Sequence, residues 1–239
     1  MLEILYILAG ILILPGLIYG AFTQINVSRT FNAFNNFQSK SGLKANEVAR
    51  IMLDDAGLRD VQIKKIKGHL TDNYNPKEKV LNLSESTFDS TSISAIGVAG
   101  HEVGHAIQHK EGYAPLKIRS ALVPVVNFAN GMFWPLFVIG IILLVVLENS
   151  SAGQIVMWIA VAFYASSTVF YLVTLPVEFN ASKRALKILS SGILSEEETP
   201  YAQKVLSSAA QTYVATLVTS ALYFLRFLFY ILIIFKKDD

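Results

Sequence analysis

The chain has 239 residues, of which 53% are hydrophobic and only 16% charged, and this composition is typical of a membrane protein rather than of one large soluble core. Its formal net charge is +2 and it has no arginine-rich stripe interleaved with aromatic residues, which argues against a nucleic-acid partner. It contains no cysteine, so disulfides, thiolate nucleophiles and cysteine-ligated metals are excluded, and any metal must be held by His, Asp or Glu.

Four apolar stretches are long enough to cross a bilayer as helices, which takes about 20 residues each. They are Leu2–Phe22, Pro124–Leu147, Ile155–Pro176 and Val214–Phe235. The first lacks the basic start of a secretory signal, and its apolar run is about twice the usual length of one, so we expect residues 1–22 to be an uncleaved transmembrane anchor. The sequence thus predicts a mainly α-helical, four-span membrane protein.

Residues 23–120 carry most of the charged side chains and are predicted to form a small α+β domain. Apolar periodicity and turn residues indicate a helix, a strand, a turn, a second strand and a final helix, which are Asn46–Ala56, Val61–Lys67, Asp72–Lys77, Lys79–Leu83 and Thr91–His109. Ser90 or Thr91 is expected to be the N-cap of the final helix.

The final helix of this segment carries the sequence His-Glu-Val-Gly-His at positions 101–105. Two histidines four residues apart project from one face of a helix, about one turn apart, so His101 and His105 can bind a single zinc ion. Glu102 is placed to take a proton from a zinc-bound water, whose pKa the metal lowers to about 7. A face of small residues would let another element approach the metal closely, and it consists of Gly97, Gly100 and Gly104.

A catalytic zinc ion needs a third protein ligand and an open fourth position. His109 continues the row of histidines, but it lies two turns from His101, and one straight helix cannot bring three such side chains to one ion. His69 falls in a turn region and is a weaker candidate. Glu178 is the strongest candidate, with His109 and His69 left as alternatives.

Topology supports Glu178 as the third ligand. The predicted transmembrane hairpin of residues 121–176 crosses the membrane twice and returns the chain to the side of His105, which lies 73 residues before Glu178. Glu178 would then lie at the start of a helix in a cytoplasmic segment, residues 177–213. The simpler alternative is a first-turn glutamate that only favours the helix dipole.

Basic residues predict the orientation of the chain. Residues 23–120 contain 13 Lys and Arg and residues 177–213 contain four, whereas the turn Glu148–Gln154 contains none. By the positive-inside rule the two basic segments face the cytoplasm. We therefore expect a multi-pass protein of the cell membrane, with its metal site facing the cytoplasm and with residues 214–239 forming the last transmembrane helix and the tail.

Four stretches of the chain resemble the YugP-like neutral zinc metallopeptidases of bacteria, and they are Gly68–Pro76, Lys79–Ser84, Ser92–His109 and Pro176–Leu186. The likeness covers nearly the whole chain, including the four-span plan. More distantly, the chain is similar to the gluzincin membrane endopeptidases, which use two histidines and a glutamate on a later helix. The resemblance implies a zincin-like catalytic domain with His101, His105 and Glu178 as zinc ligands and Glu102 as general base.

The chain departs from those distant relatives at one position. They usually carry an acid four residues after the third ligand, where this chain has Ser182, which would orient a ligand histidine only weakly. In the predicted turn, Tyr74 is a candidate for stabilising the oxyanion, with an ordinary turn tyrosine as the simpler interpretation.

These patterns predict a zinc-dependent endopeptidase that hydrolyses protein or peptide substrates at the cytoplasmic surface of the lipid bilayer. The alternative is a non-catalytic membrane transporter or scaffold with a structural zinc site, for which polar residues within the spans would be the sign, namely Asn127, Asn130 and Arg226. Arg226 faces either a partner at mid-depth or, if its helix is tilted, an interface. A third possibility is a zinc-free fold in which the histidines pack structurally.

Overall fold

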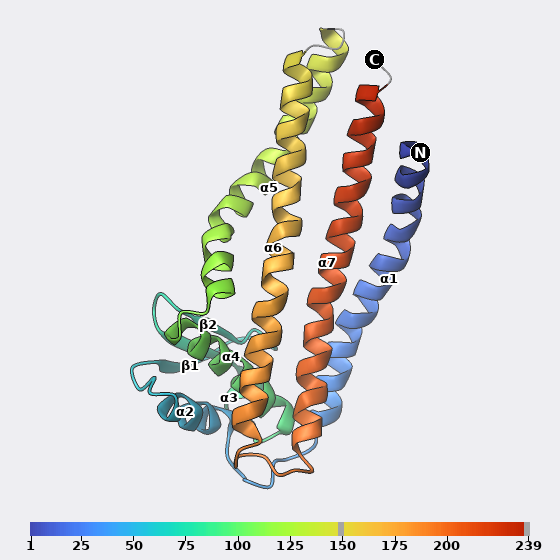
Figure 1. Ribbon diagram of the computed structural model, residues 1–239. Helices are drawn as coiled ribbons and strands as arrows, with labels where there is room; N and C mark the ends of the chain where they lie inside the picture. Colours follow the sequence, from blue (N-terminus) through green and yellow to red (C-terminus); the bar gives the residue numbers. More distant parts are fainter. Residues whose placement is uncertain (148–150, 237–239) are drawn as a thin grey trace. The chain divides into compact units, whose positions relative to one another are not determined.

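The computed structural model describes residues 1–147 and 151–236, and most of these residues are helical (Figure 1). The first part of the predicted turn Glu148–Gln154 lies outside the described residues. In chain order the elements are α1 (Leu2–Asn35), α2 (Ala45–Asp55), β1 (Gln62–Ile66), β2 (Asn73–Asn75), β3 (Val80–Ser84), α3 (Glu85–Phe88), α4 (Ile93–Lys110), α5 (Ala114–Val146), α6 (Ser151–Leu189) and α7 (Thr199–Lys236). Four of them, α1, α5, α6 and α7, are long and apolar enough to cross a membrane, as predicted.

The chain divides into two compact units, each made of several segments. The apolar unit comprises Met1–Ala21, Ile118–Thr174 and Tyr213–Asp239, and the site unit comprises Phe22–Lys117 and Leu175–Thr212. Helices α1, α5, α6 and α7 contribute residues to both units. For this reason each of these helices is longer than the apolar stretch that the sequence reveals within it.

The apolar unit is held together by aromatic packing. Phe133 of α5 lies edge-on to Phe227 of α7, with ring centroids 5.4 Å apart, and it also contacts Tyr164 of α6 at 5.1 Å. Pro124 and Pro135 lie inside α5, and the bend expected from prolines within a helix is visible in Figure 1.

Arg226 of α7 lies against the first turns of α1. Its guanidinium stands 5.1 Å from the centroid of the Tyr6 ring and donates to the Tyr6 hydroxyl at 3.4 Å. Gly10 leaves room for it, since a Cβ there would lie 3.2 Å from the guanidinium carbon. Among the residues that the structure describes, Tyr6 is thus a partner of the Arg226 side chain within the apolar unit.

The sheet of the site unit has three strands in the order β1-β3-β2. The central strand β3 pairs in parallel with β1 and antiparallel with β2. Strands β1 and β3 lie within a residue or so of their predicted positions. The prediction of a turn over Asp72–Lys77 was wrong in part, because Asn73–Asn75 pairs with β3 as an edge strand, so that Tyr74 lies opposite Leu81.

Helix α4 lies at the centre of the site unit. Its N-cap is Ser92 rather than Ser90 or Thr91, and the Ser92 hydroxyl accepts a hydrogen bond from the backbone N–H of Ala95 at 3.2 Å. Its apolar side chains are buried together with those of α2 and β3, in a core that includes Met52, Leu53, Leu81, Leu83, Ile96 and Val103. This packing fixes α4 on one side and leaves its glycine face to α6 and α7.

Candidate metal centre

The two helices that form the candidate centre approach each other at Gly104 of α4. A Cβ on Gly104 would lie 2.5 Å from the backbone carbonyl oxygen of Ala181 on α6, and a backbone atom cannot swing aside. The predicted small-residue face therefore does allow close approach of another element. This contact brings Glu178, one turn before Ala181 on α6, onto the histidine face of α4.

Glu178 lies in the interior of α6 and not at the start of a helix. Helix α6 runs from Ser151 to Leu189 and continues through Pro176. The alternative explanation of Glu178 as a first-turn residue that favours a helix dipole was therefore wrong. The side chain is 2% exposed, and a carboxylate buried to this extent needs hydrogen-bond or charge partners.

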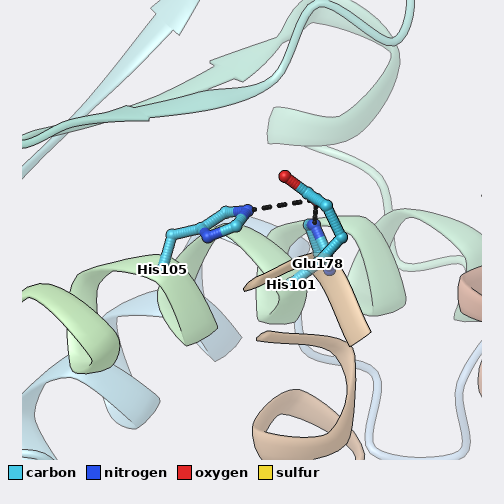
Figure 2. A group of neighbouring side chains, drawn as sticks. All are labelled: His101, His105 and Glu178. Atoms are coloured by element: carbon cyan, nitrogen blue, oxygen red, sulfur yellow. Dashed lines mark hydrogen bonds and ion pairs between the residues drawn. The ribbon is translucent and has the colours of Figure 1, made fainter. Parts of the chain in front are cut away.

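Three side chains converge at this point, His101 and His105 from α4 and Glu178 from α6 (Figure 2). Oε2 of Glu178 lies 3.2 Å from Nε2 of His101 and 3.5 Å from Nε2 of His105. One nitrogen or oxygen atom from each residue lies within 4.8 Å of the others, so a single metal ion can be held by all three. The structure thus brings together the three residues proposed from the sequence as ligands.

Gln108 determines the tautomer of His105. Its Nε2 donates to the carbonyl oxygen of Val177 at 2.8 Å and to Oδ1 of Asn180 at 2.9 Å. Its Oε1 lies 3.0 Å from Nδ1 of His105 and is left to accept, so Nδ1 carries the proton. Nε2 is then the nitrogen directed at Glu178, and it is the nitrogen that can bind a metal once it has lost its proton.

Ser182 contacts the corresponding nitrogen of His101, although a hydroxyl can either donate or accept there. Its hydroxyl lies 3.0 Å from Nδ1 of His101, again leaving Nε2 toward Glu178. The place where the distant relatives carry an acid is thus occupied by a hydroxyl that does reach the ligand histidine. A hydroxyl is a weaker hydrogen-bond acceptor than a carboxylate. Ser182 therefore orients the imidazole ring of His101 without placing a negative charge beside it.

Sequence reasoning missed the polar chain that continues behind His105. Gln108 is fully buried, and Asn180 accepts a second hydrogen bond from Nε of Arg184 at 2.7 Å. Arg184 in turn pairs with Glu111 at 2.7 Å. The spacing contained a signal for Gln108, because a residue three positions after His105 on a helix lies on the same face.

The charges of the centre act on Glu102 and His105. Burial raises the pKa of Glu102, and the nearby imidazoles of His105 and His101 oppose this rise without cancelling it. Burial lowers the pKa of His105, but the carboxylates of Glu178 and Glu102 outweigh that effect and leave it above its usual value. Glu102 therefore lies within electrostatic reach of both histidines, and a carboxylate with a raised pKa is a better proton acceptor.

The other candidate residues lie outside this group. Nδ1 of His109 is 3.0 Å from the hydroxyl of Tyr74, so these two side chains are joined by a hydrogen bond. The ring of His69 packs edge-on against Phe31, with centroids 5.3 Å apart. Among the residues that the structure describes, neither His109 nor His69 belongs to the metal-binding group.

The donor set fits zinc. Catalytic zinc is commonly held by two histidines and one glutamate, with a further position left open. Here both imidazoles have Nδ1 engaged by Ser182 or Gln108, and Nε2 directed at the same carboxylate oxygen. A buried carboxylate between two imidazoles is readily explained when all three serve one cation.

Comparison with known proteins agrees with this chemistry. The family described as "Putative neutral zinc metallopeptidase" matches residues 9–232. The chain is 43% identical over 207 residues to the "Putative membrane protease YugP" of Bacillus subtilis (strain 168), a match that covers 86% of this chain and 88% of that protein. No solved structure matches the chain. The chain therefore belongs to the family described as "Putative neutral zinc metallopeptidase", and zinc is the metal that this description names.

Proposed function

We propose that this protein is a membrane-bound zinc endopeptidase that cleaves protein substrates at the cytoplasmic surface of the membrane. The observation that carries the proposal is the convergence of His101, His105 and Glu178, from two helices, within 4.8 Å of one another. The adjacent Glu102 supplies the proton acceptor that hydrolysis requires. The excess of basic residues in residues 23–120 and 177–213 supports the cytoplasmic placement.

Each residue has a defined role in the proposed reaction. His101, His105 and Glu178 hold the metal, and Gln108 and Ser182 keep the two imidazoles turned toward it. Zinc supplies the Lewis acidity that makes a water molecule nucleophilic near neutral pH. Glu102 accepts the proton from the attacking water and passes it to the departing amine.

The proposal is tested by separating metal binding from hydrolysis. Glu102→Gln removes the proton acceptor but no proposed ligand, so purified protein should retain zinc and lose proteolysis by about 100-fold or more. Metal content and cleavage of a protein substrate in detergent are the two measurements. Glu78→Gln alters an exposed glutamate in the turn before β3 and should leave both unchanged.

Glu178→Ala provides the complementary result. It removes one of three ligands, so zinc content and proteolysis should fall together. Full proteolysis by the Glu102→Gln protein would contradict the role of Glu102. Undiminished zinc binding by the Glu178→Ala protein would contradict the role of Glu178.

A further inference from the structure

The apolar unit contains a cavity of about 530 Å³, within the size range of ligand sites. Helices α1, α5, α6 and α7 all contribute to its wall, and its polar lining residues are Asn130, Tyr164, Ser167, Tyr171, Thr216, Thr219, Ser220 and Tyr223. None of the lining residues is charged. Polar side chains are costly in the interior of a membrane, and their concentration around one cavity indicates a site with a function.

Some of these polar side chains form hydrogen bonds with one another or with a neighbour. The hydroxyl of Ser167 donates to Oδ1 of Asn130 at 2.7 Å, and the hydroxyl of Ser220 lies 2.9 Å from that of Thr168. Three groups differ. Tyr164, Tyr171 and Tyr223 line the cavity, and their phenol hydroxyls form no hydrogen bond with any residue in the described part of the chain.

These phenols restrict what the cavity would bind. A phenol hydroxyl can donate one hydrogen bond and accept another, so it suits a ligand with its own hydrogen-bonding groups, such as carbonyl acceptors, and the uncharged wall does not favour an ion. Tyr164 and Tyr223 each lie nine residues after the start of a predicted span, Ile155–Pro176 and Val214–Phe235 respectively, which is about 14 Å of helix, or nearly half of the bilayer's hydrocarbon core of about 30 Å. Lipid ester groups lie near the surface, whereas this polar wall continues toward mid-depth.

A polypeptide backbone is the neutral, acceptor-rich ligand found at that depth. Irregular backbone inside a membrane is tolerated only where it is buried in protein or lines a polar cavity, because its freed carbonyls need donors. We propose that the cavity binds a locally unwound stretch of a substrate's transmembrane segment, with its backbone carbonyls accepting hydrogen bonds from Tyr164, Tyr171 and Tyr223. This inference rests on the proposed endopeptidase function and narrows its substrates to membrane-anchored proteins.

Photo-crosslinking tests the binding without requiring hydrolysis. Full-length Glu102→Gln protein carrying benzoylphenylalanine in place of Thr219, in the cavity wall, is reconstituted in phosphatidylcholine vesicles. Two single-span probes are compared, a leucine-alanine segment and the same segment with a central Gly-Pro pair. The Gly-Pro probe, with freed carbonyls, should crosslink several-fold more strongly.

The phenols are tested by removing three hydroxyl oxygens. The triple variant Tyr164→Phe, Tyr171→Phe and Tyr223→Phe should lower crosslinking of the Gly-Pro probe by about 10-fold or more. Tyr19→Phe, an exposed tyrosine of α1 outside the cavity, is the matched control and should have no effect. In the active protein, the triple variant should lower the ratio of kcat/KM for a membrane-tethered substrate to that for the same sequence in soluble form.

The following outcomes would contradict either the proposed use of the cavity or the proposed function. Equal crosslinking of the two probes, or crosslinking unaffected by the triple variant, would exclude recognition of freed carbonyls by the phenols. Crosslinking to lipid alone would assign the cavity to lipid. A protein that cleaves neither substrate would contradict the proposed endopeptidase function, while the crosslinking, measured on the Glu102→Gln protein, would still decide the use of the cavity.

Discussion

Gln108 shows how a single buried amide can organise a metal centre. Its amide nitrogen donates hydrogen bonds to Val177 and Asn180 on α6. Its amide oxygen is therefore the atom that faces His105, and it accepts a hydrogen bond from Nδ1. One side chain therefore both sets the tautomer of a ligand and joins the two helices that supply the ligands. The side chain is fully buried, so water cannot take over these bonds if it is lost.

Replacing Gln108 with leucine should weaken zinc binding by about 10- to 100-fold, because the ring of His105 loses its orientation and the carbonyl of Val177 loses its donor. Competition with a chromophoric chelator measures this affinity. Gln203→Leu, at an exposed glutamine of α7, is the control and should leave the affinity unchanged. An unaltered affinity in Gln108→Leu would show that the tautomer is set by other contacts.

At this scale the sequence predicted the three converging side chains, His101, His105 and Glu178, better than the residues that support them. The pair His101 and His105 is visible because metal binding demands a fixed spacing, and Glu178 could be inferred because two crossings return the chain to one side. Gln108 supports the centre through contacts with α6, and the pairing of helices distant in sequence is not encoded in local spacing. The pairing of Tyr74 with His109 was missed for the same reason.

Two glycines of α4 differ in how closely another helix approaches them, Gly104 facing α6 and Gly97 facing α7. At Gly104 an added Cβ would meet the carbonyl oxygen of Ala181 at 2.5 Å, whereas at Gly97 the nearest atoms belong to Ala202 at 3.9 Å, an ordinary contact. Both positions are glycines of the same helix. Comparing an alanine substitution at each of them therefore separates the effect of helix propensity from that of close packing.

Gly104→Ala should lower the free energy of unfolding by about 1–3 kcal/mol, because the helices must separate, and it should weaken zinc binding by moving Glu178 away from the histidines. Gly97→Ala should be neutral or stabilise the protein by up to about 1 kcal/mol through helix propensity. Thermal unfolding in detergent and chelator competition measure the two effects. Equal tolerance of both substitutions would show that α4 and α6 are not in close contact.

The sequence predicted the helices and strands with different accuracy. Long apolar runs revealed four helices, but their polar extensions, such as residues 199–213 of α7, were not detected, since hydropathy reports only the part that avoids water. Strand β2 was taken for a turn because its two asparagines are poor strand formers. Pairing with β3 outweighs that propensity, and this pairing is a tertiary effect.

At the scale of the whole molecule, Glu198 joins distant segments of the site unit. Its Oε1 accepts from the backbone N–H of Lys40 at 2.6 Å, its Oε2 accepts from that of Ser195 at 2.8 Å, and the residue is 4% exposed. Burial alone would raise the pKa of this carboxyl, but these backbone hydrogen bonds outweigh it and hold the pKa below its ordinary value. The loop after α1 is thereby fastened to the loop before α7.

A lowered carboxyl pKa in the folded state means that the stabilisation from Glu198 is present above the ordinary carboxyl pKa of about 4.3 and is lost as the pH falls through the lowered value. Glu198→Gln should therefore lower stability at pH 7 by about 1–3 kcal/mol, and less in acid. Thermal unfolding of both proteins between pH 7 and pH 3 gives this difference. A difference that is constant with pH would exclude the ionised carboxylate as its source.

The absence of cysteine makes the proposed orientation testable without background labelling. Lys77→Cys, in the turn after β2, should react with a membrane-impermeant maleimide only from the cytoplasmic side. Ser151→Cys, exposed at the start of α6, should react only from the opposite side. Intact and inverted vesicles distinguish the two, and the reverse pattern would place the metal centre outside the cell.

The origin of the three converging side chains also affects biosynthesis. His101 and His105 emerge from the ribosome 77 and 73 residues before Glu178, and α5 and most of α6 must be synthesised before the carboxylate can dock beside Gly104. A nascent chain that has reached only α5 holds two of the three groups and would capture metal weakly. The proposed enzyme would therefore gain its metal, and its ability to damage neighbouring proteins, only after three of its four candidate membrane helices have been synthesised.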